Sequence, residues 1–248
     1  MELIFTPGTP EHTLMEFLSY PLNTGEPILN RFASLRGAIR RAGSATGEGF
    51  VFVPGARPDA AVLVAHADTY FLTAAGEHKM VLSNGTVSSA EPDAGIGADD
   101  RAGCAIAWLL KDSGHHLLIL DGEELGRVGA SYLMKNFFEI KKIIQASSFM
   151  VEFDRRNENE YKIYDLPVTE EFVAYIEKET GFTEPDKRAF SDICTLCTEG
   201  CCGVNLSVAY KNEHDQNETL DIAAWKKNYL LFASMLNKPL QKFDLKRP

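Results

Sequence analysis

The sequence predicts an α/β protein of three layers, an α/β/α sandwich in which helices cover both faces of a mostly parallel central sheet. Short, wholly apolar runs such as residues 60–65 and 117–120 are typical of strands buried on both faces. Longer stretches with apolar residues at helical spacing separate these runs. The runs and stretches alternate along the chain, which is the pattern of parallel α/β sheets. At 248 residues, the chain is long enough for one such domain with a well-buried core.

The first part of the chain is expected to contain two helices and two strands. Residues 10–20 form a short helix with proline at its first position. Residues 26–42 carry apolar side chains at helical spacing and are predicted as a longer amphipathic helix. Residues 50–53 read as a strand that a Pro-Gly pair ends. Residues 60–65 form the first strand that is expected to be buried on both faces.

The middle of the chain supplies a hairpin, two helices and a strand. The polar segment 69–97 contains turn residues, with a small hairpin around residues 83–86. Residues 102–111 are small and apolar and are predicted as a helix packed tightly on the sheet. Residues 117–120 form another buried strand, and a helix over about 130–138 follows.

The last hundred residues complete the alternation. An apolar stretch, residues 143–153, is followed by a helical pattern over residues 169–180. Residues 204–208 form a further strand, and residues 210–218 are the loop beyond it. Residues 219–236 are expected to be the closing helix.

Composition and charge are those of a soluble globular protein, with 45% hydrophobic and 24% charged residues. The formal net charge of −10, without any basic patch, argues against a nucleic acid or an anionic membrane as partner. Residues 1–5 lack the pattern of a signal peptide, and no apolar run is long enough for a membrane helix. We therefore expect a cytoplasmic protein with a single domain over residues 1–248. The sequence leaves its oligomeric state unknown.

Four of the five cysteines lie between residues 194 and 202. A secreted disulfide framework would spread its cysteines along the chain, so a reduced, cytoplasmic protein is expected. The cluster could bind a zinc ion of its own, form a local disulfide, or pack as small buried thiols. Because the spacing is not that of two CxxC pairs, buried thiols are the preferred interpretation.

Acidic residues and histidines at strand ends form the candidate site. At the carboxyl ends of apolar strands, or at a helix start, lie His66, Asp99, Glu123, Glu124, Asp154 and His214. Those strand ends share one edge of a parallel sheet, where residues far apart in sequence converge. Two imidazoles and three carboxylates can hold two zinc ions if one carboxylate bridges them, which leaves the fourth free as a base. His115 and His116 precede their strand and therefore lie at the wrong end to join the site.

Taken singly, these residues have ordinary structural explanations. A lone histidine after a strand is more often a surface or hydrogen-bonded core residue than a ligand. Asp99-Asp100 alone would be a helix amino-terminal cap, and Glu123-Glu124 alone a solvated acidic turn. Clustered on one sheet edge, however, the carboxylates would repel one another strongly without a counter-ion, and so the whole set favours a metal centre.

The order of the motifs resembles that of the co-catalytic dinuclear zinc exopeptidases, which include the bacterial leucyl aminopeptidases, the tripeptidases and related metallo-carboxypeptidases and deacylases. That family has His-x-Asp after a strand, Asp-Asp at the head of a small-residue helix, Glu-Glu-x-Gly, a separate Asp and a distal His. The chain carries these elements in the same order as His66-Ala67-Asp68, Asp99-Asp100, Glu123-Glu124-Leu125-Gly126, Asp154 and His214. The resemblance spans about residues 60–220.

The resemblance implies a set of metal ligands. His66 and Asp154 would bind one metal ion, Glu124 and His214 would bind the other, and Asp99 would bridge the two. Asp99 is preferred to its neighbour because of its spacing to the glycine in the helix that follows. The implied cofactor is a pair of Zn²⁺ ions, although Co²⁺ or Mn²⁺ can occupy similar ligands.

The resemblance also implies two catalytic roles. Asp68 would accept a hydrogen bond from His66 and so orient that ligand. Glu123 would be the general base, which takes a proton from the metal-bridging water and passes it to the leaving amine. The Asp99–Asp100 peptide bond would be cis, as in relatives.

The branch of the family is left open. Residues 69–98 and 155–213 are too few for the inserted lid or dimerisation domain of many relatives, which implies a catalytic domain alone. The local sequence Gly-Ala-Asp-Asp-Arg-Ala-Gly, however, resembles that of the multi-domain tripeptidases and of the family members that form large oligomers. Ser191-Asp192 resembles a Ser-Asp-His element of the aminopeptidases, but Ile193 replaces the histidine.

The implied activity is that of a metallopeptidase, an aminopeptidase-like hydrolase whose substrate is a small peptide. Two enzymatic alternatives are an N-acyl amino acid deacylase or carboxypeptidase-like amidohydrolase, and a glutaminyl cyclase-like enzyme. A third alternative is not an enzyme but a non-catalytic metal-binding module that recognises peptide ends.

Overall fold

The computed structural model describes residues 5–74, 78–185 and 190–246. The main sheet contains the strands Ile39–Ala42 (β1), Gly49–Val53 (β2), Val62–His66 (β3), His116–Leu120 (β6), Met150–Arg155 (β7), Tyr161–Lys162 (β8) and Gly203–Ser207 (β9). A smaller sheet contains Met80–Ser83 (β4), Thr86–Ser89 (β5), Tyr210–Lys211 (β10) and Thr219–Asp221 (β11). The helices are Pro10–Leu18 (α1), Glu26–Ala33 (α2), Ala98–Leu109 (α3), Val128–Asn136 (α4), Phe138–Ala146 (α5), Glu170–Thr180 (α6), Ile193–Leu196 (α7) and Ile222–Leu236 (α8). Residues 1–4, part of the segment in which no signal peptide is expected, lie outside the described residues.

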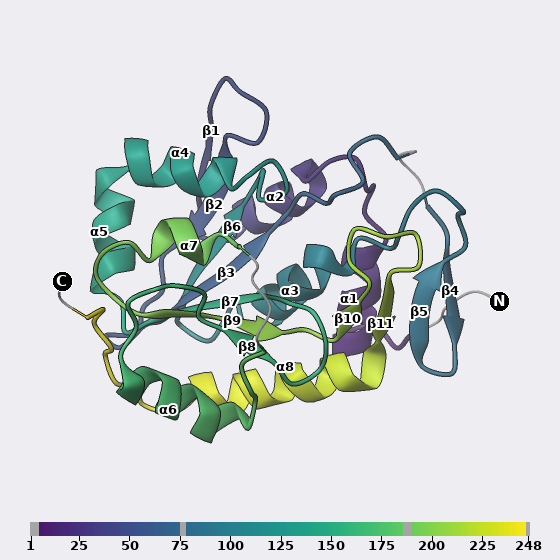
Figure 1. Ribbon diagram of the computed structural model, residues 1–248. Helices are drawn as coiled ribbons and strands as arrows, with labels where there is room; N and C mark the ends of the chain where they lie inside the picture. Colours follow the sequence, from purple (N-terminus) through teal and green to yellow (C-terminus); the bar gives the residue numbers. More distant parts are fainter. Residues whose placement is uncertain (1–4, 75–77, 186–189, 247–248) are drawn as a thin grey trace.

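The main sheet has the strand order β1-β2-β6-β3-β7-β9-β8 (Figure 1). The inner strands β6, β3, β7 and β9 are parallel to one another, whereas β2 and β8 run antiparallel to their neighbours. In the β3–β6 pair, His66 lies opposite Leu120, so the residues that follow these two strands emerge side by side. The prediction of a mostly parallel sheet is confirmed.

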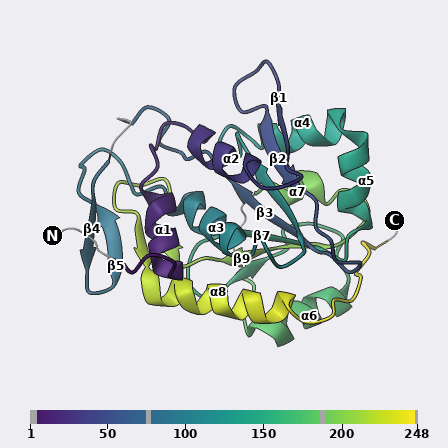
Figure 2. The ribbon, with the colours of Figure 1, turned by 180° about the vertical axis from the view of Figure 1, so that it is seen from behind.

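Each face of the main sheet packs against its own set of helices, because successive side chains of a strand point to opposite faces. Leu63 and Ala65 of β3 belong to a core with side chains of α1, α2, α3, α6 and α8. Val62 and Val64 belong to a second core with side chains of α4, α5 and α7. Figures 1 and 2 show α6 and α8 on one side of the molecule and α4 and α5 on the other. The predicted three-layer architecture is therefore confirmed.

The smaller sheet, in the order β10-β11-β5-β4, joins two segments far apart in sequence (Figure 1). Its β4–β5 hairpin turns at Asn84 and Gly85, both with positive φ, as the sequence predicted. Strand β11 pairs with β5 through Leu220 and Val87. The loop between β10 and β11 contains His214, so this unpredicted sheet holds the distal histidine in place.

The helix predicted over residues 26–42 is wrong in its second half. Helix α2 ends at Ala33, and Gly37 then adopts a φ of +80°, which an α-helix does not contain. Ile39 begins β1 and pairs with Phe52 of the neighbouring strand. The helical spacing of apolar residues extended beyond the end of α2, because Ile39 also packs against the core. Ile39 does so from strand β1, after the chain has reversed direction.

The closing helix also begins later than predicted. Residues 219–221 pair with β5 as a strand, and the Asp221 carboxylate then accepts the N–H of Ala224 at 2.8 Å. This cap starts α8 at Ile222. The apolar stretch 143–153 is likewise divided, its first part ending α5 and its last part forming β7.

The cysteine cluster consists of free thiols. Cys197, Cys201 and Cys202 are buried, whereas Cys194 is partly exposed. The Sγ atoms of Cys201 and Cys202 each lie 3.3 Å from a main-chain carbonyl oxygen. The interpretation as small buried thiols is confirmed for Cys197, Cys201 and Cys202, but not for Cys194. Among the residues that the structure describes, no helix is both long and apolar enough to cross a membrane.

Candidate metal centre

The carboxyl edge of the parallel strands brings the candidate residues together. They come from the end of β3 (His66), the first turn of α3 (Asp99), the turn after β6 (Glu123 and Glu124), the end of β7 (Asp154) and the β10–β11 loop (His214). Five separate segments therefore contribute to one site.

The donor atoms form two groups that share one residue. His66, Asp99 and Asp154 make the first group, and Asp99, Glu124 and His214 make the second; within each group the donor atoms lie within 4.8 Å of one another. Asp99 Oδ1 is 3.0 Å from His66 Nε2, and Asp99 Oδ2 is 3.3 Å from His214 Nε2. A single carboxylate thus faces both imidazoles, one with each oxygen, as a bridging ligand would.

The adjacent aspartate has a different environment. The Asp99–Asp100 peptide bond is cis, as expected. Asp100 is fully buried, and its carboxylate accepts main-chain N–H groups of His66 at 3.1 Å and Gly103 at 3.0 Å. Asp100 is therefore occupied with the main chain, whereas Asp99 faces the imidazoles.

Neighbouring hydroxyl groups orient Asp154. Its Oδ1 lies 3.5 Å from His66 Nε2 and accepts the Tyr210 hydroxyl at 3.1 Å, while its Oδ2 accepts the Ser191 hydroxyl at 2.9 Å. The sequence assigned no role to Ser191, because Ile193 departs from the Ser-Asp-His element. The serine of that element was the signal that could have identified Ser191, because its hydroxyl group donates to Asp154.

The second donor group is more open. His214 Nε2 lies 2.9 Å from Glu124 Oε1, yet this buried oxygen makes no hydrogen bond of ordinary geometry. The ring of Tyr70 stacks on the His214 ring, with centroids 4.5 Å apart and planes 12° apart. Tyr70 lies in a polar, turn-rich segment, where the sequence carries no signal for such a contact.

Asp68 connects the two halves of the site. His66 Nδ1, the ring nitrogen that points away from Asp99 and Asp154, lies 3.2 Å from the main-chain carbonyl oxygen of Asp68 and 3.4 Å from its carboxylate Oδ1. The two carboxylate oxygens of Asp68 accept the main-chain N–H groups of Glu123 at 3.2 Å and Glu124 at 3.1 Å. One buried carboxylate therefore orients an imidazole and fixes the acidic turn.

Glu218 is a residue that the sequence did not single out. Its fully buried carboxylate accepts main-chain N–H groups of Ile96, Gly97 and Asp99, at 2.7–3.0 Å. These bonds fix the segment that carries Asp99 into the site. A glycine-flanked segment before a helix offers several free N–H groups, but nothing local shows which acceptor will meet them.

The pKa shifts of the site residues indicate a site that is suited to added positive charge. Burial raises the pKa values of Glu124 and Asp154, and the nearby Asp99 carboxylate raises both further. Burial lowers the pKa of His66, but its carboxylate neighbours outweigh burial and raise it overall. The carboxylates of Asp99 and Glu124 raise the pKa of His214 to about 11. Two divalent cations would satisfy these carboxylates and the orphaned Glu124 oxygen together.

A cavity of about 290 Å³ opens onto both donor groups. Its walls are Asp99, Glu123, Asp154, Arg155, Arg156, Tyr164, Phe190, Tyr210, Glu213 and His214. The two arginines are already matched, since Arg155 pairs with Glu160 at 2.8 Å and Arg156 pairs with Glu213. The cavity over the donor groups therefore has an excess of negative charge.

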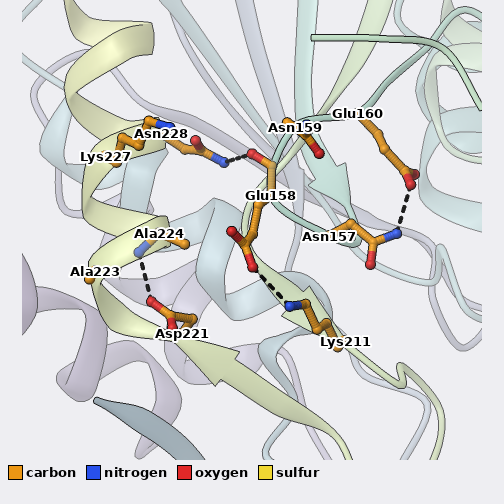
Figure 3. A pocket seen from close by; sticks show the side chains of 10 residues that line it. All are labelled: Asn157, Glu158, Asn159, Glu160, Lys211, Asp221, Ala223, Ala224, Lys227 and Asn228. Carbon is orange, nitrogen blue, oxygen red and sulfur yellow. Dashed lines mark hydrogen bonds and ion pairs between the residues drawn. The ribbon is translucent and has the colours of Figure 1, made fainter. Parts of the chain in front are cut away.

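A further hollow, of about 720 Å³, lies elsewhere, among the loop 157–160, β10 and α8 (Figure 3). Its polar side chains are largely bound to one another or to the main chain: Lys211 pairs with Glu158 at 2.8 Å, and the Asn228 amide donates to a carbonyl oxygen at 2.8 Å. Neither donor group lies there. This hollow is therefore not the candidate centre.

Similarity to solved structures extends over nearly the whole chain. The chain is similar to the aminopeptidase PepT from Bacillus cereus, at 16% identity and a TM-score of 0.64, over 92% of this chain and 97% of that one. It is similar to a tripeptidase from Staphylococcus aureus, at 13% identity and a TM-score of 0.68, over 92% and 97%. It is also similar to the Pyrococcus horikoshii TET1 peptidase, which can assemble into a tetrahedron or a large octahedral shell, at 13% identity and a TM-score of 0.63, over 92% and 99%.

These similarities show that the chain has the fold of those aminopeptidases and tripeptidases. The expected likeness to exopeptidases is thereby confirmed at the level of the fold. No protein-family model and no curated protein matches the chain.

Proposed function

We propose that the protein is a dinuclear zinc-dependent exopeptidase of the aminopeptidase type that hydrolyses short peptides. The observation that carries this proposal is the pair of donor groups that share Asp99 beneath a cavity lined by Glu123. A shared carboxylate between two imidazoles suits two metal ions held close together. The fold of the similar solved structures supports the same activity.

The donor set fits zinc. His66 and Asp154 would hold one ion, Glu124 and His214 the other, with Asp99 between them. Nitrogen and oxygen donors of this kind are ordinary zinc ligands, and they also accept cobalt or manganese. The fit is supported by Asp99, whose two carboxylate oxygens lie 3.0 and 3.3 Å from the Nε2 atoms of His66 and His214.

Glu123 is placed to move the proton. When bound, zinc supplies Lewis acidity that polarises a carbonyl group and lowers the pKa of water. The Glu123 carboxylate lines the cavity, and no described residue donates a hydrogen bond to it. Without metal, burial raises the pKa of Glu123 to about 10, so the group is protonated; the charge of His66 opposes this shift, and that of Asp154 adds to it. Two cations at the neighbouring ligands would lower this pKa again, and the ionised carboxylate could then take a proton from the attacking water and deliver it to the leaving amine.

Metal content and turnover test the proposal. We expect the purified protein to bind about two zinc ions per chain, to release amino-terminal residues from short peptides, and to lose turnover on chelation. Peptides with a blocked amino group should be poor substrates. Turnover of N-acyl amino acids alone would indicate a deacylase, and cyclisation of an amino-terminal glutamine would indicate a cyclase. Two bound metals without any turnover would contradict the proposal and favour a peptide-recognition module.

The two adjacent glutamates should separate base from ligand. Glu123→Gln is expected to keep both metals but to lower kcat by about 100-fold or more, because a positioned base contributes about 10²–10⁴. Glu124→Gln is the matched control and should lose metal as well as activity. Metal analysis with steady-state kinetics on the two variants checks this. Full activity in Glu123→Gln would remove Glu123 as the base.

A further inference from the structure

A second hollow, of about 310 Å³, adjoins the cavity over the metal centre. We call it the side pocket, and its walls are Arg127, Lys162, Tyr164, Asp165, Leu166, Phe190 and Cys194. Tyr164 and Phe190 also line the cavity over the metal centre. The two hollows therefore adjoin each other at Tyr164 and Phe190.

Two cations line the side pocket, and only one has a carboxylate partner among the described residues. Lys162 Nζ lies 3.0 Å from Glu184 Oε1 and donates to the carbonyl oxygen of Pro185 at 3.0 Å. No described carboxylate lies within ion-pair distance of Arg127, although the Arg127 charge opposes the burial that raises the pKa of Asp192, a nearby buried carboxylate. The wall residue Asp165 is exposed and pairs with no described cation. Of the two wall cations, Arg127 is therefore the one without a carboxylate in direct contact.

The position of Arg127 ties it to the chemistry. Its main-chain N–H donates to the carbonyl oxygen of Glu123 at 2.9 Å, so it belongs to the same turn as the proposed base. Its guanidinium carbon lies 5.5 Å from the centroid of the Phe190 ring, which is 72% exposed. A guanidinium fork beside an aromatic ring is suited to a planar anion such as a carboxylate.

We propose that the side pocket receives a carboxylate group of the peptide substrate, with Arg127 as its counter-ion. The inference rests on the proposed function, which places a peptide in the adjoining cavity. An aminopeptidase would hold the amino end of the peptide over its metal centre, so Arg127 attracts a negative charge further along the peptide. That charge comes either from the carboxyl terminus of a short peptide or from an acidic side chain.

Peptide binding to a Glu123→Gln background tests the proposal without turnover. Isothermal titration calorimetry of the zinc-loaded protein compares trialanine with trialanine amide, and an amidated Glu-containing tripeptide with its Gln counterpart. We expect one of these charged peptides to bind roughly 10-fold tighter than its neutral partner, as one charge-assisted contact allows. A preference in the first pair identifies the carboxyl terminus, and a preference in the second identifies an acidic side chain.

Arg127→Met in the same background should remove that preference. The Kd of the neutral peptide should change by less than about threefold relative to the protein with Arg127. Arg127→Gln serves if the methionine variant does not fold, and circular dichroism checks both. Lys162→Met is the matched control, because its charge is already neutralised, and it should keep the preference. The proposal is overturned if no charged peptide is preferred, or if the preference survives loss of Arg127 or disappears with Lys162. Wild-type turnover is measured separately, so failure of the exopeptidase proposal is distinguishable from failure of this one.

Discussion

A single buried carboxylate, Asp68, meets three groups of the candidate site. It faces the Nδ1 atom of His66 and accepts the main-chain N–H groups of Glu123 and Glu124. The first contact, together with that of the Asp68 carbonyl oxygen to the same Nδ1 atom, leaves Nε2 to face Asp99 and Asp154, and the other two contacts hold the acidic turn against β3. Asp68 therefore acts through its neighbours rather than on the substrate.

Replacing Asp68 should weaken metal binding rather than abolish it. Asp68→Asn puts an amide N–H against either a main-chain N–H or the imidazole, so metal affinity should fall by about 10–100-fold. Competition with a zinc chelator measures the change. Asp112→Asn, at a side chain that is 87% exposed, is the control and should bind metal normally. Unchanged affinity in Asp68→Asn would contradict this orienting role.

His115 lies away from the site, as the sequence predicted, and has a structural role. Its Nδ1 accepts the N–H of Ala61 at 3.0 Å, and its Nε2 lies 2.9 Å from the carbonyl oxygen of Leu236. Burial lowers the pKa of His115. This arrangement requires a neutral ring, protonated at Nε2, that joins β3 to the end of α8.

Stability should therefore fall as the pH decreases below about 6.5, the ordinary histidine value. In that range the unfolded chain binds a proton at His115, and the folded chain does not, so the free energy of unfolding decreases. The contribution reaches at most about 1 kcal/mol between pH 6.5 and 5.5. Urea unfolding of metal-free protein at several pH values should show a smaller decrease in His115→Gln. Equal decreases in both proteins would contradict this assignment.

At the scale of elements, the close approach of α3 to the sheet brings Asp99 into the site. Gly103 makes this approach possible: a Cβ atom there would lie 2.0 Å from the carbonyl oxygen of Phe153 and 2.3 Å from Asp100 Oδ1. The small residues predicted for this helix are thus explained by its contact with β7.

Gly103→Ala should destabilise the protein, although the same change in an exposed helix would stabilise it by about 1 kcal/mol. The clash with main-chain atoms must move α3 away from β7, at a cost of about 1–3 kcal/mol. Urea unfolding measures the difference, and metal affinity should fall with it, because Asp100 and Asp99 move together. A variant as stable as the parent would show that the helix can shift freely.

The small sheet illustrates how one element depends on another. Strand β11 pairs with β5, which places the β10–β11 loop and His214 opposite Glu124. The pairing of residues 80–89 with residues 210–221 is a long-range contact that the sequence of neither segment predicts by itself. The helix predicted over residues 219–236 is confirmed from Ile222 on and wrong at Thr219–Asp221, because the partner strand decides the conformation of those three residues.

At the scale of the whole molecule, the candidate centre joins five segments that lie between residues 66 and 214. Removing bound metal should therefore lower the melting temperature of the entire domain. A ligand at 1,000 times its Kd stabilises by about 4 kcal/mol, which corresponds to roughly 10 °C for a chain of this size. Calorimetry with and without a chelator measures the shift. Glu123→Gln should show the same shift, whereas His214→Ala should show a smaller one; equal shifts in both would remove His214 as a ligand.

The sequence by itself determined the fold class, the strands β3 and β6, the hairpin at residues 83–86 and the set of candidate residues. Wholly apolar runs must be buried on both faces, and the carboxylates that follow them must then emerge at one edge. Those are local properties, carried by spacing and residue type. The cis bond at Asp99–Asp100 also followed, through the resemblance of the motif.

Only the tertiary structure decided which atoms meet. It turned Asp99 toward both imidazoles and Asp100 toward the main chain, and it brought Ser191 and Glu218 to residues far from them in sequence. It also placed Arg127 beside Phe190, at the edge of the cavity. The physical reason is that a buried polar atom takes its partner from whatever packing brings near, and packing between distant segments leaves no trace in the local order of residues.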